Sequence, residues 1–263
     1  MKAPRHTLAL AVLLSGFAAT AGLLDNLRSA LQTNNPATNI SLSSTAPAAL
    51  TQDQMIGGLK EALGKGVQHA VATLGHTDGF LTNLDVKIPL PEKLQKVESV
   101  LRAAGQGQLA DDFVGSMNHA AEQAVPVAAD VFGEAVQQMT ISDAKAILTG
   151  PADAATQYFR RTTRTNLQAK FYPIVQRATD QVGVTAQYKA MMGKFTALDT
   201  VSSFFGSKAG PQLSAGDIDA YVTDKAMDGL FKRVAEEEKS IRTNPLARTT
   251  DLLQTVFGAD AKP

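Results

Sequence analysis

The residues best placed for chemistry lie near the C-terminus, in the stretch AEEEKSIRTNPLARTTDLL (235–253). A helix is expected over 217–242, and its apolar residues recur at three- and four-residue steps. Glu237 and Glu238 fall on or beside that apolar stripe, with Arg242 one turn further on. A carboxylate held partly out of water either takes up a proton or needs a cation beside it. The pattern therefore predicts buried acids that are paired with guanidinium groups.

We interpret this stretch as a polar clamp that pins a last helix, expected over 247–257, to the one before it. Arginine suits the role because its planar fork binds a carboxylate through two hydrogen bonds. The candidate residues are Glu237, Glu238, Arg242, Arg248, Asp251, Arg160, Arg161 and Arg164. Two alternatives stay open: a solvated charged tip, and a ligand or catalytic site in which paired carboxylates do acid–base work.

Other chemical motifs are weak or absent. The histidines beyond the N-terminal segment, His69, His76 and His119, show no metal-binding spacing, so neither a metal nor a cofactor is predicted. The sequence has no nucleophile elbow, and GLKEALGKG (58–66) has the wrong spacing for a phosphate loop. The basic group at 160–164 fits a solvated helix flank or an internal partner for acids, with an anion grip as the alternative.

The N-terminus predicts export to the periplasm. Two basic residues precede a short apolar run and an Ala-Thr-Ala cleavage signal, so residues 1–21 read as a signal peptide cleaved after Ala21. The chain has no cysteine, which excludes a lipoprotein and disulfides. Without 1–21 the chain has two more acidic than basic residues and no transmembrane segment is expected. This balance argues against nucleic acid as a partner of the whole molecule, although a local basic patch stays compatible with it.

The remaining sequence predicts one all-α, bundle-like domain of about eight helices over 51–258. It follows a flexible leader at 22–50 and precedes a disordered tail at 259–263. Thr51 and Gln54 predict a capping box, Pro126 should split a long helix, and Ser142 is expected to cap a short one. A short extended segment is expected near 84–88, where Leu84, Val86 and Ile88 alternate with polar residues. Further helices are expected over 91–104, within 153–183 with a bend at Pro173, and over 185–198.

Several phrases of this sequence together resemble a family of exported bacterial proteins that is described only as a domain of unknown function. They are TQDQMIGGLKEAL, TDGFL, IPLPEKLQKVE, FVGSMNHAAEQAVP, ISDAKAIL, ATQYFRR, DKAMDGLF and EEEKSIRTNPLARTTDLL. The likeness spans about 50–258. It implies a bacterial envelope location and a mostly helical domain. It brings no activity, so no catalytic residue is carried over.

Two classes of function follow. The first is a non-enzymatic periplasmic helical protein that binds an envelope protein or a small amphiphile, or that serves the envelope as a structural protein. The second is a periplasmic hydrolase that uses the C-terminal carboxylates with arginine support. An open cleft around those acids would favour the hydrolase, and a closed network of paired charges would speak against it.

Overall fold

A computed structural model describes residues 51–202 and 213–244, with the side chains of 199–202 left out. These residues form one all-α domain of eight α-helices and two short 3₁₀ helices, without a strand. The elements are α2 (Gln52–Leu74), η1 (Glu92–Leu94), α3 (Gln95–Ala103), α4 (Gln108–Ala124), η2 (Val125–Val127), α5 (Ala128–Gln138), α6 (Ile141–Thr149), α7 (Ala154–Gln181), α8 (Val184–Ser202) and α9 (Ala215–Thr243). The helix expected over 247–257 lies outside the described residues.

Side-chain caps set where several helices begin. Thr51 and Gln54 form the predicted capping box of α2, each side chain bonding the other residue's backbone N–H. Ser214 and Asp217 do the same for α9. The prediction that Ser142 caps the short helix is wrong, because Thr140 occupies that position. Thr140 forms a capping box with Asp143, three residues further on. The helix therefore begins two residues earlier than a cap at Ser142 would place it.

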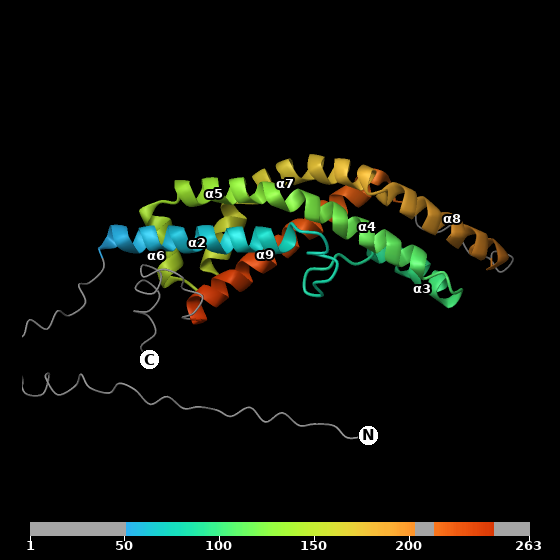
Figure 1. Cartoon of the computed structure of the whole chain (residues 1–263), viewed down its shortest axis with the longest axis horizontal. Coiled ribbons are helices and arrows are strands. Elements are labelled where there is room, and N and C mark those ends of the chain that lie inside the picture. Colours follow the sequence, from blue (N-terminus) through green and yellow to red (C-terminus); the bar gives the residue numbers. More distant parts are fainter. Residues whose placement is uncertain (1–50, 203–212, 245–263) are drawn as a thin grey trace, which may run out of the picture. The chain divides into compact units, whose positions relative to one another are not determined.

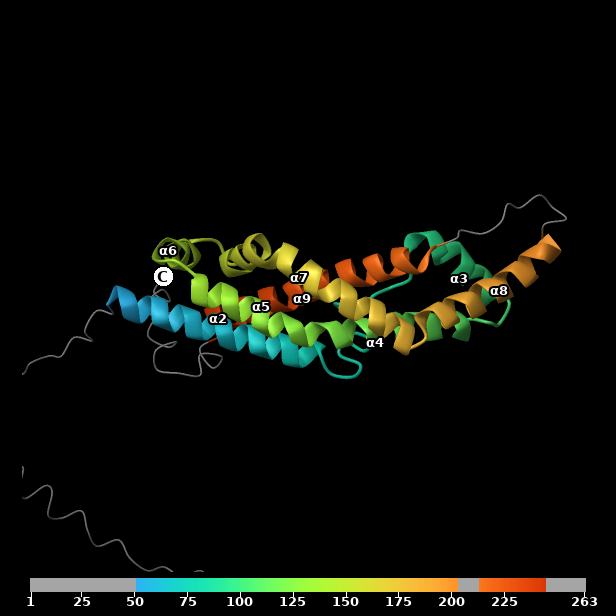
Figure 2. The ribbon, with the colours of Figure 1, turned by 90° about the horizontal axis from the view of Figure 1, so that it is seen from above.

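Helices α7 and α9 form the central pair of the domain, and α7 also contacts α4, α5, α6 and α8. Helix α9 contacts α2, α4 and α7, while α5 packs against α2 and α7. Figures 1 and 2 show α4 and α5 following one another along α7, with α9 crossing beneath them. The break between α4 and α5 falls at Pro126, as predicted, where the chain takes one turn of 3₁₀ helix.

The centre of the core is aromatic where α5, α7 and α9 meet. The ring of Phe132 lies edge-on to Phe159, with centroids 4.9 Å apart, and to Phe231 at 5.8 Å. All three side chains are fully buried. Arg160 lies over the outer face of the Phe231 ring, 4.6 Å from its centroid, so its guanidinium covers the end of this aromatic group.

The segment between α2 and η1, residues 75–91, is ordered without regular structure. Residues 84–86 form a turn, and only 87–91 continue without turns. Leu84 is 88% exposed whereas Val86 and Ile88 are buried, so the three do not share one face as their alternation suggested. The turn separates Leu84 from the other two.

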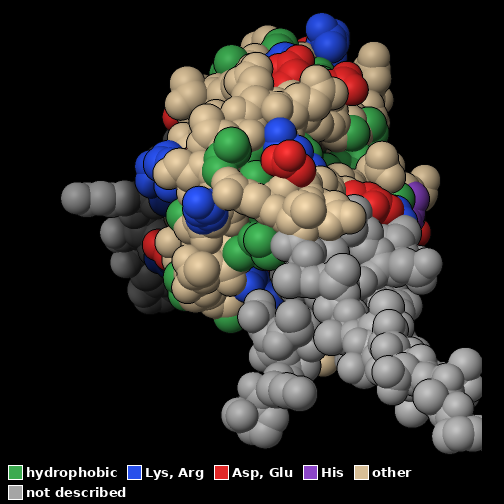
Figure 3. Space-filling view, turned by 90° about the vertical axis from the view of Figure 1, so that its left-hand side faces the viewer, with side chains coloured by type: hydrophobic (Ala, Val, Ile, Leu, Met, Phe, Trp, Pro, Cys, Tyr) green, Lys and Arg blue, Asp and Glu red, His purple; other side chains and the backbone are tan. Residues whose placement is uncertain are grey.

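The described surface carries mixed charge. Figure 3, which looks onto one end of the domain, shows Lys and Arg side chains interspersed with Asp and Glu. Within the described ranges, none of the helices has the length and apolar character that crossing a membrane requires.

One buried acid on α9 gives a pH-dependent prediction. Asp219 is 4% exposed, and the Thr179 hydroxyl of α7 lies 2.7 Å from its Oδ1. Burial raises the pKa of the Asp219 carboxyl above its ordinary value; Asp180 adds to the rise and the Thr179 hydrogen bond opposes it. Because the folded state holds this proton more tightly than the unfolded chain, the stabilisation is present at low pH. It is lost as pH rises through the folded pKa.

Asp219→Asn copies the protonated side chain at every pH. We expect it to match wild type in urea denaturation at pH 3, below the ordinary pKa of an aspartate. At pH 7 it should be more stable than wild type, because the amide has no charge to desolvate and still accepts the Thr179 hydrogen bond. A variant that is less stable than wild type at pH 7 would contradict this assignment.

Candidate functional site

The predicted clamp residues fall at several places in the fold. Glu238 of α9 is 5% exposed and lies at the N-terminus of α7. Its carboxylate accepts the backbone N–H groups of Ala155 and Thr156 at 2.9 and 2.8 Å, and the Thr156 hydroxyl at 2.8 Å. These two N–H groups have no partner within their own helix. Because α7 has no acidic residue in its first turn and no side-chain cap, Glu238 supplies the missing negative charge.

Arg242 completes the charge balance at Glu238. Its Nε and Nη2 donate to Glu238 Oε1 at 3.1 and 3.0 Å, and Nη2 also donates to the Ile147 carbonyl near the end of α6. The cavity beside these groups measures about 10 Å³, at most the room for one water molecule. The arrangement joins α9 to α6 and α7, and it offers no space for a substrate.

The other predicted residues that the structure describes do not join this pair. Glu237 binds His69 Nδ1 at 2.7 Å and Arg233 Nη2 at 2.6 Å. Arg160 covers the Phe231 ring, and Arg161 pairs with Asp143 at 3.4 Å with 67% of its side chain exposed. Arg164 is also exposed. Arg248 and Asp251 lie outside the described residues.

A second group of buried polar residues holds the irregular segment 75–91 against α4. Asn118 is fully buried, and its side chain pairs with Ile88 much as a neighbouring strand would. Asn118 Oδ1 accepts the Ile88 N–H at 2.8 Å, and Nδ2 donates to the Ile88 carbonyl at 2.9 Å. A backbone stretch without a ladder partner thereby has both polar groups satisfied.

One turn further along α4, Glu122 holds the first part of the same segment. Its carboxylate, 5% exposed, accepts the N–H groups of Asp78 at 3.1 Å, Phe80 at 3.0 Å and Leu81 at 3.4 Å. Three converging backbone donors form an anion-binding turn. Asp78 has a φ of 65°, a left-handed conformation that non-glycine residues rarely adopt. Its carboxylate lies 3.1 Å from His119 Nε2.

The far side of this segment rests on a glycine of α9. A Cβ at Gly229 would lie 2.7 Å from a ring carbon of Phe80 and 3.2 Å from the Cβ of Val86. Phe80 is fully buried. We expect Gly229→Ala to lower the free energy of unfolding by about 1–3 kcal/mol through overpacking. Gly133→Ala on α5 is the control, because a Cβ there meets nothing within 4 Å. If urea denaturation showed the same change in stability for the two variants, the close contact at Gly229 would be unimportant.

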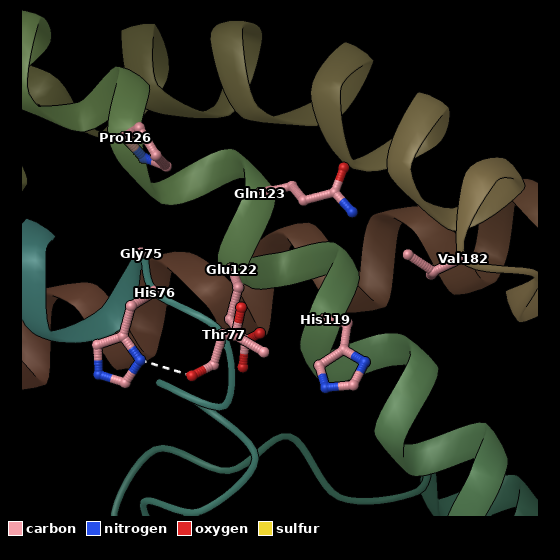
Figure 4. Close-up of a pocket in the computed structure, with 8 residues that line it drawn as sticks. All are labelled: Gly75, His76, Thr77, His119, Glu122, Gln123, Pro126 and Val182. Carbon is pink, nitrogen blue, oxygen red and sulfur yellow. Dashed lines mark hydrogen bonds between the residues drawn. The ribbon is translucent and has the colours of Figure 1, made fainter.

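The segment, α4 and the end of α7 border an open hollow of about 320 Å³, which we call the α4 pocket. Figure 4 shows the residues that line it, which are Gly75, His76, Thr77, His119, Glu122, Gln123, Pro126 and Val182. His119, Glu122 and Gln123 come from α4, and Pro126 from the break that follows it. Volumes of roughly 300–1,000 Å³ are usual for small-molecule sites.

The two histidines of the α4 pocket differ in what orients them. His76 Nδ1 lies 2.6 Å from the Thr77 carbonyl, so the ring donates there and keeps Nε2 as an acceptor when neutral. His119 contacts the Asp78 carboxylate through Nε2, so its Nδ1 is the ring nitrogen that points away from Asp78. In the described part of the chain no cluster of three or more His, Cys, Asp or Glu side chains is placed to hold a metal ion.

A larger hollow of about 530 Å³ lies between η1 and the start of α9. It is bordered by Pro91, Lys93, Leu213, Tyr221 and Lys225 among others. Burial raises the pKa of the Tyr221 hydroxyl, and Glu92 adds to the rise. Leu213 directly follows the undescribed residues 203–212, whereas every wall of the α4 pocket belongs to described helices or to the 75–91 segment. The α4 pocket is therefore the better defined candidate.

Sequence reasoning missed Asn118 and Glu122. The signal was present, since both fall on the apolar side of α4, beside the buried Met117 and Ala121. A polar residue on a core-facing stripe needs a partner, so the argument that predicts partners for Glu237 and Glu238 holds equally for Asn118 and Glu122.

The fold and the site define a class: an all-α domain whose α4 pocket is walled by a loop held on buried polar side chains. The chain belongs to the family described as protein of unknown function DUF4197, whose family model matches residues 49–258. That range includes every described helix. No curated protein and no solved structure matches the chain.

Proposed function

We propose that this chain is an exported protein that binds a small ligand in the α4 pocket. The observation that carries the proposal is a pocket whose wall is fixed before any ligand arrives. Glu122 and Asn118 hold the 75–91 segment with buried hydrogen bonds. A preorganised wall avoids the entropy cost of ordering a loop on binding.

The lining favours a ligand with both polar and apolar parts, such as a small amphiphile. Pro126 and Val182 offer apolar surface, while Thr77, Gln123 and the two imidazoles offer hydrogen-bonding groups. We do not propose hydrolysis at the C-terminal carboxylates, because Glu238 is enclosed and its oxygens are engaged by α7 and Arg242.

Export is supported by the sequence of residues 1–21, which has the charge, length and cleavage pattern of a signal peptide. A protein recovered from a periplasmic fraction should begin at Gly22, by N-terminal sequencing. A protein that keeps Met1 and stays in the cytoplasm would contradict this part of the proposal.

A thermal-shift screen with small amphiphiles tests the binding. A ligand at about 100 times its Kd stabilises the folded state by about 2.7 kcal/mol, which raises the melting midpoint measurably. Gln123→Trp should abolish the shift because it fills the pocket. The matched control is Gln138→Trp, an exposed position on α5 outside the pocket. Hits that stabilise both variants equally, or the absence of hits, would count against the proposal.

A further inference from the structure

Positive charge is concentrated on two consecutive helices, α7 and α8. Residues 154–202, which contain both helices, have seven basic and two acidic residues. The other described residues, 51–153 and 213–244, have 12 basic and 20 acidic ones. The mixed charge at one end of the domain therefore does not extend along α7 and α8. A basic region on a chain that is acidic elsewhere points to a local anionic partner.

Most of these cations reach solvent and lack a partner within the fold. The exposed and half-buried ones, which we call the α7–α8 ridge, are Arg161, Arg164, Lys170, Arg177, Lys189 and Lys194. In the described part of the chain, only Arg161 of this set forms a salt bridge, with Asp143 at 3.4 Å. Arg161 and Arg164 are three residues apart, and like charges at that spacing destabilise a helix. The folded state itself therefore does not account for this charge.

The ridge lies on the outside of the domain. Helix α7 contacts α4, α5 and α9, and α8 packs against α3 and α4. Figure 1 shows α7 and α8 following one another along the upper edge, with α4 and α5 beneath them. At about 1.5 Å per residue, the path from Arg161 to Lys194 is about 50 Å along the helix axes. Cations spread over that length fit an extended anionic surface better than a small ligand.

One aromatic ring lies among the cations of α7. Tyr172 is 36% exposed, whereas Leu167 and Phe171 are fully buried and mark the inner face of the helix. At about 100° per residue, Arg164 and Lys170 leave that inner face on opposite sides, and Tyr172 lies on the outer face between them. A tyrosine flanked by cations is typical of helices that lie on lipid headgroups.

We propose that the α7–α8 ridge docks on the surface of an anionic phospholipid membrane. This contact does not depend on ligand binding in the α4 pocket. The long basic side chains reach the phosphate groups from both sides of α7, and the Tyr172 ring lies at the level of the headgroups. Lipid fits better than nucleic acid because a planar layer meets this one edge of the domain. A strand that wraps around the domain would also meet its acidic helices.

Sedimentation with lipid vesicles tests the proposal. The mature protein is mixed with vesicles of phosphatidylcholine alone, or of phosphatidylcholine and phosphatidylglycerol in equal parts. We expect it to sediment with the anionic vesicles only, and added salt to weaken the binding because exposed charges are screened. Binding to neither kind of vesicle, or equal binding to both, would overturn the proposal. So would tighter binding to a DNA duplex at the same phosphate concentration.

Two triple variants with the same change in net charge locate the contact. The first replaces three cations of α7: Arg164→Gln, Lys170→Gln and Arg177→Gln. The second replaces exposed lysines of α3, α6 and α9: Lys96→Gln, Lys145→Gln and Lys239→Gln. Each basic residue near an anionic membrane strengthens binding about fivefold, so the first variant should bind about 100-fold more weakly and the second about as well as wild type. Equal losses in the two variants would contradict the role of the ridge.

A tryptophan reporter tests which face meets the lipid, because the chain has no tryptophan of its own. The emission of Tyr172→Trp should move to shorter wavelength when anionic vesicles are added, since its indole ring enters the headgroup region. Gln138→Trp, at an exposed position on α5, should keep its emission unchanged. A shift at position 138 without one at position 172 would overturn the assignment of α7 as the membrane-facing helix.

Discussion

Glu238→Gln is expected to lower the free energy of unfolding by about 3 kcal/mol, measured by urea denaturation at pH 7. The glutamate joins the N-terminus of α7 to Arg242, and both sides need its negative charge. A neutral amide keeps one acceptor oxygen but turns an NH₂ group toward backbone donors or toward the guanidinium. Arg242, with 17% of its side chain exposed, then loses the Glu238 carboxylate as its partner while water reaches its guanidinium poorly.

Glu236→Gln is the matched control for this effect. Glu236 stands two residues away on the same helix, but its side chain is 38% exposed and its partner is Arg233, with which it forms an i,i+3 pair. Exposed pairs of this kind contribute roughly 0–1 kcal/mol. Similar losses in the two variants would show that burial at the α7 N-terminus is not what matters.

Glu122→Gln is expected to release the 75–91 segment from α4. The carboxylate accepts three backbone N–H groups while 5% exposed, and hydrogen bonds to a charged acceptor contribute more than neutral ones. We expect a loss of about 2–3 kcal/mol in urea denaturation. Hydrogen exchange at the Phe80 and Leu81 amides should accelerate on the order of 50-fold as the segment opens locally.

Glu134→Gln on α5 provides the comparison, because Glu134 is exposed and outside the pocket. It should leave both stability and exchange at Phe80 unchanged. Unaltered exchange at Phe80 and Leu81 in Glu122→Gln would mean that the segment is held mainly by its apolar side chains, and the wall of the α4 pocket would then need another explanation.

Most of the helical framework could be predicted because its signals are local. Capping at Thr51 and the break at Pro126 depend on residues within one or two turns. The misassigned cap at Ser142 was also a local matter, since Thr140 and Asp143 form the reciprocal pair. Leu84 was misplaced because a pattern of alternating residues does not separate a strand from a turn followed by an extended segment.

The site could be predicted only in part because its contacts are distant in sequence. Periodicity placed Glu238 on the buried side of α9, yet its partners on α7 lie more than 80 residues away. Arginines 160, 161 and 164 were reasonable partners by charge, but α7 faces Glu238 with its N-terminus. The partial charge of a helix terminus comes from backbone groups, so no charged residue in the sequence marks it as an electrostatic partner.

Native mass spectrometry of the mature protein, isolated gently from the periplasm, tests the central claim most directly. We expect wild type and Gln138→Trp to carry a bound small molecule that Gln123→Trp lacks. The molecule should be lost on mild activation, as a non-covalent ligand is. The same bound species on all three proteins, or none on any of them, would contradict the claim that the α4 pocket is a ligand site.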